Sequence, residues 1–410
     1  MNKTGSVKFG ILWNSLQQFG QLGITFVSTI ILARLLTPED YGIYGILMIF
    51  ISVSEMLADS GIAGYIIKKQ NVTPIYYDTL FVYNMCVSGI MYLFLFFSAP
   101  FIADFYEKEM LISVIRILGL VLLLHAFSIT QFTRLLKDLQ FHKLALISIV
   151  AGVAALCVAL LLAYRGLGIW ALIFQQLVLV ALTTILYLVV NRRIPHFRFD
   201  MRVFKEQFAF GINLFGSSVL MAITNNIGNN IIAKIFSMNI AGLYVQAVRL
   251  QNYPLSMVSN VVDKTFFPIF SKMNDDWRLL KEQICKLRRL LYAVLFPLFS
   301  VAICFAKPIV SIVLGEKWLG SVSYFQILML ASFPLLVKAL NRNVLKSFGF
   351  TAVIFRIEVY SAVLLLFCLF IAFLFKSILV VLLAVVLGQS FSALFSICLL
   401  YTSDAADDMQ

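Results

Sequence analysis

Long apolar runs dominate the chain, and most are long enough to cross a membrane as a helix, which takes about 20 mainly apolar residues. The runs lie at residues 9–36, 41–67, 80–101, 111–132, 144–164, 167–190, 208–236, 241–262, 290–306, 322–340, 352–375 and 377–400. They do not alternate between apolar and polar residues, as the strands of a membrane barrel do. The pattern therefore predicts an all-α polytopic membrane protein with about 12 transmembrane helices.

The first run, Phe9–Leu36, carries a polar stripe. Its polar residues recur at spacings that place them on one helical face. They are Asn14, Gln17, Gln18, Gln21, Thr25 and Ser28. A membrane-length helix with such a face has something polar to contact. We interpret the stripe as the wall of a polar cavity; the alternative is that the amides hydrogen-bond to neighbouring helices and hold them together.

A motif in this region recurs 200 residues later. Ile31–Tyr44 reads ILARLLTPEDYGIY, and Ile231–Tyr244 reads IIAKIFSMNIAGLY. The matched residues keep one constant offset without gaps, which indicates the same structural unit used twice. An even number of predicted helices precedes each copy, so both halves run in the same direction through the membrane. Two parallel six-helix lobes predict a pseudo-two-fold axis along the membrane normal, with the substrate path between the lobes.

The repeat divides the chain into predicted domains. They are an N-terminal lobe at 1–190, a basic cytoplasmic linker at 191–207 and a C-terminal lobe at 208–397. The last segment, 398–410, reads CLLYTSDAADDMQ, is acidic and does not continue the apolar run before it. We interpret it as a translated sequencing-library adapter joined to a truncated reading frame. The native protein would then continue beyond the twelfth helix.

Composition and charge agree with a membrane protein. The chain is 61% hydrophobic and 13% charged, whereas soluble domains are nearer a quarter charged. Its net charge of +12 comes from Lys and Arg residues concentrated in the N-terminus and in alternate loops. This bias places the N-terminus in the cytoplasm and does not indicate nucleic-acid binding. The six cysteines are scattered without a CxxC pair, so neither a disulfide framework nor a metal site is expected.

Motifs for common enzymatic chemistry do not occur in the sequence. It has no GxxxxGK[ST], HExxH or GxSxG pattern, and its three histidines lie far apart. We therefore expect no enzymatic activity, no cofactor and no metal.

Polar residues inside the apolar runs are the candidates for function, because they are costly in a membrane. Amides can bind sugar hydroxyls, and Arg can hold a phosphate through two parallel hydrogen bonds. The predicted substrate-binding residues are Asn14, Gln17, Gln18, Gln21, Arg116, Asn225, Asn229, Arg249, Gln251, Asn252, Lys338 and Arg342. The alternatives are packing for the amides and snorkelling to the membrane surface for the cations.

Acidic residues inside the runs form a second candidate set. Glu55 and Asp59 are four residues apart on one helix face, and Glu358 lies in a later run. A carboxyl group in a low-dielectric cavity can exchange a proton in the physiological range, which would couple transport to an ion gradient. The alternative is a salt bridge to a nearby cation, such as Arg356 for Glu358.

Three segments resemble a known family. They read WNSLQQFGQLGITFVSTIILARLLTPEDYGIYGI from Trp13, LADSGIAGYIIKKQNVT from Leu57 and VRLQNYPLSMVSNVVDKTFFPIFSKM from Val248. The chain resembles polysaccharide repeat-unit flippases of the Wzx type, which export O-antigen, teichuronic acid and colanic acid precursors. These belong to the multidrug/oligosaccharidyl-lipid/polysaccharide exporter superfamily. The similarity runs from Val7 to about Ile397.

The resemblance implies a function and a setting. The substrate would be an undecaprenyl-diphosphate-linked oligosaccharide, moved from the cytoplasmic to the periplasmic leaflet of a bacterial inner membrane. The fold would be a MATE-like, V-shaped pair of lobes around a cationic cavity, with Arg249, Arg116 and Arg34 as its cations. H⁺ or Na⁺ would be the coupling ion, and a polysaccharide polymerase a partner.

Three other functions stay open at this point. A multidrug or cation antiporter and a lipid II flippase belong to the same superfamily. A membrane glycosyltransferase or polymerase is disfavoured, because it needs a large periplasmic loop with catalytic residues, and the longest predicted connection is cytoplasmic.

Overall fold

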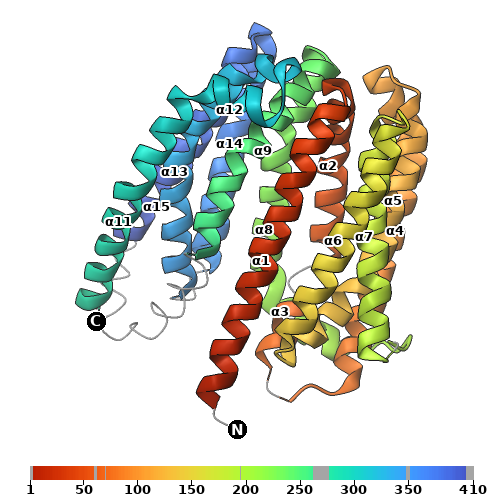
Figure 1. Ribbon diagram of the computed structural model, residues 1–410. Helices are drawn as coiled ribbons and strands as arrows, with labels where there is room; N and C mark the ends of the chain where they lie inside the picture. Colours follow the sequence, from red (N-terminus) through yellow and green to blue (C-terminus); the bar gives the residue numbers. More distant parts are fainter. Residues whose placement is uncertain are drawn as a thin grey trace. The chain divides into compact units, whose positions relative to one another are not determined.

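The computed structural model describes residues 3–59, 62–69, 71–193, 195–261, 277–347 and 351–402. Within these ranges, the regular elements are all helical, which confirms the predicted fold class (Figure 1). The helices are α1 (Lys3–Leu35), α2 (Pro38–Asp59), α3 (Ile62–Lys68), α4 (Pro74–Tyr106), α5 (Met110–Lys137), α6 (Phe141–Tyr164), α7 (Ile169–Asn191), α8 (Met201–Ile235), α9 (Met238–Val261), α11 (Trp277–Cys304), α12 (Ala306–Val313), the 3₁₀ helix η2 (Glu316–Ser321), α13 (Val322–Ser347), α14 (Thr351–Phe375) and α15 (Ile378–Thr402).

Each predicted span falls on a helix, but the predicted number of membrane crossings is not confirmed. Nine of the described helices are long and apolar enough to cross a membrane, or ten if α11 and α12, bent by 75° at their junction, count as one span. Helices α8 and α9 are outside this set. Both carry several amides, with three basic residues in α8 and one in α9, and these residues lower the hydropathy. The run predicted at 41–67 is divided between α2 and α3.

The chain divides into two compact units, Met1–Ile223 and Thr224–Gln410. The boundary lies inside α8, so the predicted linker at 191–207 belongs to the first unit. Two hydrogen bonds account for this: the His196 backbone N–H donates to Asp78 Oδ1 (3.0 Å) and the Asp200 N–H to Thr79 Oγ1 (3.2 Å). Both acceptors are buried residues at the start of α4. The segment that leaves α7 is therefore fastened to α4 before α8 begins.

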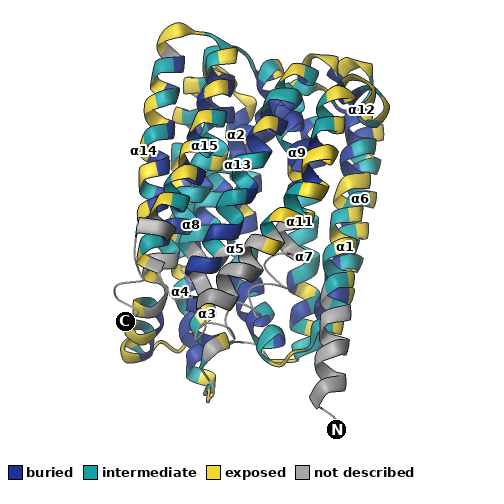
Figure 2. Cartoon of the chain, turned by 90° about the vertical axis from the view of Figure 1, so that its left-hand side faces the viewer, coloured by how far each residue is buried: buried dark blue, intermediate teal, exposed yellow. Residues whose placement is uncertain are grey.

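Helix α6 shows how side-chain size decides helix packing in the first unit. Its buried stripe includes Ala151, Ala155 and Ala159, whereas Val150 and Leu161 are exposed. Figure 2 colours the helices by burial, and α6 carries both buried and exposed positions. Small residues allow helix backbones to approach closely, which replaces the hydrophobic drive that is missing between helices in lipid. Large apolar side chains facing outward are what a helix in contact with lipid requires. Helix α6 packs its small-residue side against α1 and α7.

The repeated motif forms the same turn in both units. In the first, the Asp40 N–H donates to Thr37 Oγ1 (3.3 Å); in the second, the Ile240 N–H donates to Ser237 Oγ (3.2 Å). Each hydroxyl caps the N-terminus of the following helix, α2 or α9, by satisfying a free backbone N–H. Thr37 and Ser237 are 200 residues apart, so the sequence offset corresponds to a repeated local structure.

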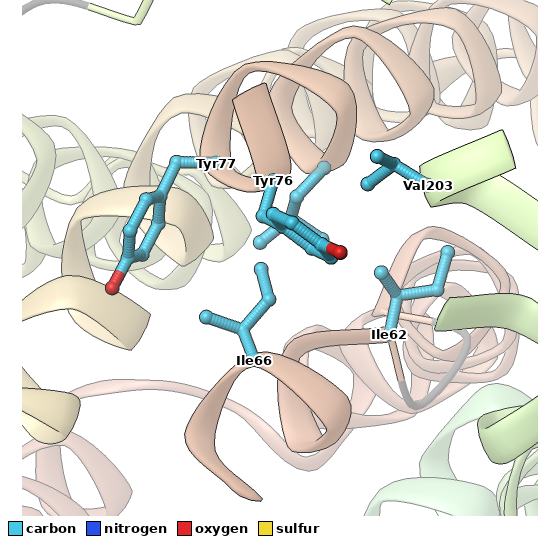
Figure 3. Packing of buried hydrophobic residues seen from close by; sticks show 6 residues of the cluster. Ile62, Ile66, Tyr76, Tyr77 and Val203 are labelled. Carbon is cyan, nitrogen blue, oxygen red and sulfur yellow. The ribbon is translucent and has the colours of Figure 1, made fainter. Parts of the chain in front are cut away.

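The short helix α3 is held in the first unit by a compact apolar cluster. Ile62 and Ile66 pack with Tyr76, Leu80 and Val203, which come from the starts of α4 and α8 (Figure 3). The C-terminal end of α3 is capped by Lys137 of α5, whose ammonium group donates to the backbone carbonyl oxygens of Ile66 (2.8 Å) and Lys69. A cation at a helix C-terminus donates hydrogen bonds to the last carbonyl groups and interacts favourably with the helix dipole. This docking positions the residue after α3, Lys69.

Candidate functional site

The residues of the predicted polar stripe on α1 lie in different environments. Gln17 and Gln18 are half-buried and Gln21 is exposed, whereas Ser28 is buried and accepts a hydrogen bond from Gln175 Nε2 of α7 (2.7 Å). The side chain of Asn14 lies outside the described residues. The C-terminal end of the stripe therefore joins α1 to α7, and the glutamines toward its start stay available for contacts beyond the helix.

The acidic pair of α2 is described only in part. Glu55 is half-buried, four residues before the end of the helix. The side chain of Asp59 lies outside the described residues.

Arg116 of α5 is placed against an aromatic ring. Its guanidinium carbon lies 4.2 Å from the ring centroid of Phe96 on α4, and its buried Nε has no hydrogen-bond partner among the described residues. Cation–π contact with Phe96 stabilises the charge within the α4–α5 pair. The Arg34 side chain, at the end of α1, is exposed.

The amides predicted on α8 and α9 differ in their partners. Gln251 is buried, and its Nε2 donates to the Leu328 carbonyl oxygen (2.6 Å) and to Ser332 Oγ (3.1 Å) on α13. This is the packing role that was weighed as the alternative. Asn225 and Asn252 are exposed, and Arg249 is half-buried.

Two buried amides have no hydrogen-bond partner among the described residues. They are Asn229 of α8, which is 5% exposed, and Gln246 of α9, which is fully buried; both side-chain atoms of each are affected. A buried amide without a partner costs free energy, so each favours a water molecule or polar group beside it. Gln246 was not among the predicted site residues, although Arg249, Gln251 and Asn252 of the same run were.

Lys338 and Glu358 come together as an ion pair. Lys338 Nζ of α13 lies 2.9 Å from Glu358 Oε2 of α14, with side chains 15% and 4% exposed. Both residues were predicted, one for substrate and one for an ion. The structure gives Glu358 this partner from the neighbouring helix. Arg342 lies one turn after Lys338 on α13 and is half-buried.

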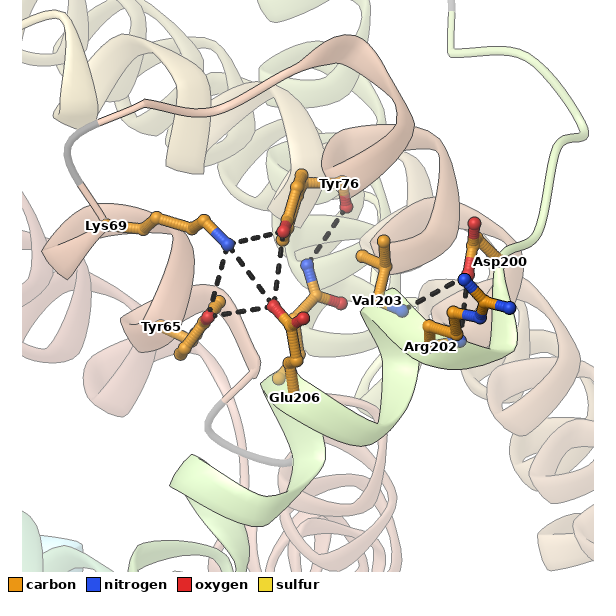
Figure 4. Close-up of polar contacts among 8 residues, drawn as sticks. Tyr65, Lys69, Tyr76, Asp200, Arg202, Val203 and Glu206 are labelled. Carbon is orange, nitrogen blue, oxygen red and sulfur yellow. Dashed lines mark hydrogen bonds and ion pairs between the residues drawn. The ribbon is translucent and has the colours of Figure 1, made fainter.

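A polar cluster in the first unit was not predicted. Lys69 donates to Glu206 Oε2 (3.2 Å) and to the Tyr76 hydroxyl, and the hydroxyls of Tyr65 (3.1 Å) and Tyr76 (3.2 Å) donate to the same carboxylate (Figure 4). Hydrogen bonds from Lys69 and the two tyrosines hold the pKa of Glu206 below its ordinary value, and the bonds to Tyr76 and Glu206 raise that of Lys69. The cluster ties the segment after α3 to the starts of α4 and α8.

The residues that the structure describes include no group of three or more His, Cys, Asp or Glu side chains that could hold a metal ion.

Comparison with protein families decides the family. The sequence model of the family described as "Polysaccharide biosynthesis protein" matches residues 31–323. The chain belongs to this family. The resemblance predicted from the three segments is thereby confirmed.

Curated relatives carry names from the same field. The chain is 26% identical to the teichuronic acid biosynthesis protein TuaB of Bacillus subtilis over 89% of its length, 24% to the lipopolysaccharide biosynthesis protein WzxC of Escherichia coli over 78%, and 24% to the succinoglycan biosynthesis transport protein ExoT of Rhizobium meliloti over 75%. It spans 75%, 65% and 62% of the lengths of these relatives.

Solved structures share the fold. The lipid II flippase MurJ in an inward closed conformation is 12% identical with a TM-score of 0.78, covering 95% of this chain and 87% of its own. An inward-facing multidrug resistance MATE family transporter of the MOP superfamily is 14% identical with a TM-score of 0.71, covering 94% of this chain and 96% of its own. The MATE-like fold predicted for the chain is confirmed.

Proposed function

We propose that the protein is a flippase that moves an undecaprenyl-diphosphate-linked oligosaccharide from the cytoplasmic to the periplasmic leaflet of a bacterial inner membrane. The observation that carries the proposal is the family match across residues 31–323. The similarity to a succinoglycan biosynthesis transport protein supports it. In this proposal the protein is a transporter and not an enzyme, and its N-terminus is cytoplasmic, as the loop charges predict.

The diphosphate sets the first requirement. An unpaired diphosphate in a low-dielectric site would cost many kcal/mol, so the path must supply cations. Arg249 and Arg342 are half-buried and chemically suited to phosphate oxygens. The sugars need hydrogen-bond partners instead, which Gln17, Gln18 and Asn225 offer. The isoprenoid chain is apolar and needs no polar partner.

The Lys338–Glu358 pair links the substrate to a proton in this proposal. A diphosphate near Lys338 competes with Glu358 for the ammonium group. Glu358 is 4% exposed, and a buried carboxylate that loses its cation becomes far more costly. Uptake of one proton at the Glu358 carboxyl removes that cost, so substrate binding and proton binding favour each other. Glu55 of α2 is a second candidate for ion coupling, in the first unit.

Export in cells tests the proposal. The gene is expressed in a strain that lacks its own repeat-unit flippase, and surface polysaccharide is measured. The proposal expects export by the wild type, strong loss with Lys338→Gln, and full export with Lys307→Gln, an exposed lysine of α12. Resistance to toxic cations without polysaccharide export would indicate a multidrug antiporter instead. Rescue of lipid II translocation alone would indicate a lipid II flippase.

A further inference from the structure

An open apolar groove lies between α11 and α13 in the second unit. Its volume is about 630 Å³, within the range of sites for small ligands. Seven residues line it: Tyr292, Ala293, Phe296, Pro297, Phe333, Pro334 and Val337. Six of them have wholly apolar side chains, and the substrate path proposed above uses none of the seven.

Two prolines that line the groove lie at one level of the α11–α13 pair. Gln326 Nε2 donates to the Ile303 carbonyl oxygen (3.0 Å), and further along the pair the ring of Phe333 lies 5.3 Å from that of Phe299. The contacts run in opposite directions along α11 and α13, so the helices are antiparallel and Pro297 is level with Pro334. A proline inside a helix removes a backbone hydrogen bond and bends the helix. Both prolines therefore belong to the walls of the groove.

One end of the groove is cationic. Arg288 lies one turn before Tyr292 on α11 and close enough to influence it electrostatically. Lys286 and Arg289, on the same turn, are exposed. The antiparallel register brings Arg342 of α13 to the level of Arg288. An apolar groove that ends at several cations can bind a molecule with a long apolar chain and an anionic head.

We propose that this groove binds the isoprenoid chain of the lipid-linked substrate, with its diphosphate at Arg288, Arg289 and Arg342. The inference rests on the proposed function. The walls of aromatic rings and prolines are stiff, which suits the methyl-branched surface of an isoprenoid. Arginines in several positions suit the two adjacent phosphate groups of a diphosphate, because each can bind phosphate through two hydrogen bonds.

Binding of undecaprenyl diphosphate to the purified protein in nanodiscs of neutral lipid tests the inference. Ala293→Trp places a large ring in the groove, and Val363→Trp places the same ring on an exposed position of α14 as the control. We expect at least tenfold weaker binding with Ala293→Trp and no change with Val363→Trp. Equal weakening in both variants, or displacement of the probe by an equimolar amount of phosphatidylglycerol, would overturn the proposal.

A second measurement uses the wild type and does not depend on how a variant folds. Undecaprenyl diphosphate with a photoreactive group on its chain should label peptides containing residues 288–297 and 333–342. Labelling confined to other helices would overturn the inference. Normal polysaccharide export by Ala293→Trp protein would reject the groove and leave the flippase proposal standing. Groove labelling in a wild type that exports no polysaccharide would support the groove as a binding site and reject the flippase proposal.

Discussion

Lys338 of α13 and Glu358 of α14 form a buried ion pair, with 2.9 Å between Nζ and Oε2. The two residues are neighbours across a helix pair that also contacts α15. Because the pair is buried, removing one charge leaves the other without a counter-ion, which costs several kcal/mol of stability. In the proposed function, this dependence would let an anionic substrate change the protonation state of Glu358.

Removing one member of this pair should destabilise the protein more than removing both. Lys338→Met leaves the carboxylate buried without its cation, which costs about 3–5 kcal/mol in comparable buried pairs. The double variant Lys338→Met/Glu358→Leu removes both charges and should recover most of the loss. Thermal unfolding of the purified protein in detergent measures this. A single variant as stable as Lys307→Met, the exposed control, would show that the pair is not buried.

The two repeated caps should contribute similarly to stability. Thr37→Ala and Ser237→Ala each remove a hydroxyl that caps a helix, and each should cost about 1 kcal/mol. Thr73→Ala is the matched control, because Thr73 occupies the N-cap of α4 without a side-chain cap hydrogen bond. Unfolding midpoints of the three variants would show the difference. A loss with Thr73→Ala equal to the other two would contradict the capping account.

Gly119 of α5 should not tolerate a side chain. A Cβ at this position would lie 2.9 Å from the ring of Tyr92 on α4. Forcing extra volume into such a contact costs about 1–3 kcal/mol. Gly89→Ala is the control, because a Cβ there meets nothing within 4 Å on the same α4 helix. Hence Gly119→Ala should lower the unfolding midpoint and Gly89→Ala should leave it unchanged or raise it; the opposite order would contradict the α4–α5 packing.

The Lys69–Glu206 cluster should stabilise the protein over a defined pH window. Hydrogen bonding lowers the pKa of Glu206 from its ordinary 4.5, so its contribution is present above pH 4.5 and is lost as pH falls through the lower folded value. The pKa of Lys69 is raised from 10.5, so its contribution is present below pH 10.5 and is lost as pH rises further. The midpoint difference between the wild type and Glu206→Gln should therefore be constant near neutral pH and vanish in acid.

Glu109→Gln, an exposed carboxylate at the start of α5, controls for general charge effects in that titration. A Glu206→Gln difference that persists unchanged in acid would contradict the hydrogen-bonded carboxylate.

Hydropathy was enough to place most of the helices, because each membrane crossing takes about 20 mainly apolar residues. The constant offset between Ile31–Tyr44 and Ile231–Tyr244 also predicted a repeated unit, and the structure shows the same capping turn at Thr37 and Ser237. The break between α2 and α3 was missed, because the run around Ile62 stays apolar on both sides of it.

The site was less predictable, because its contacts join residues that are distant in sequence. Lys69 and Glu206 are 137 residues apart, and no helical period relates them. Glu358 was compared with Arg356, its neighbour along the chain, whereas its observed partner is on another helix. Polarity inside an apolar run identified Gln251 as important, but only the structure shows that its amide bonds to α13.

Translocation in a purified system tests the central claim most directly. The protein is reconstituted into vesicles that contain an undecaprenyl-diphosphate-linked oligosaccharide with a fluorescent sugar, and a membrane-impermeant quencher reports which leaflet holds it. The account predicts that the protein makes the inner-leaflet pool accessible to the quencher, and that Lys338→Gln slows this at least tenfold while Lys307→Gln does not. Vesicles with folded wild-type protein that translocate no faster than protein-free vesicles, with or without a proton or sodium gradient, would contradict it.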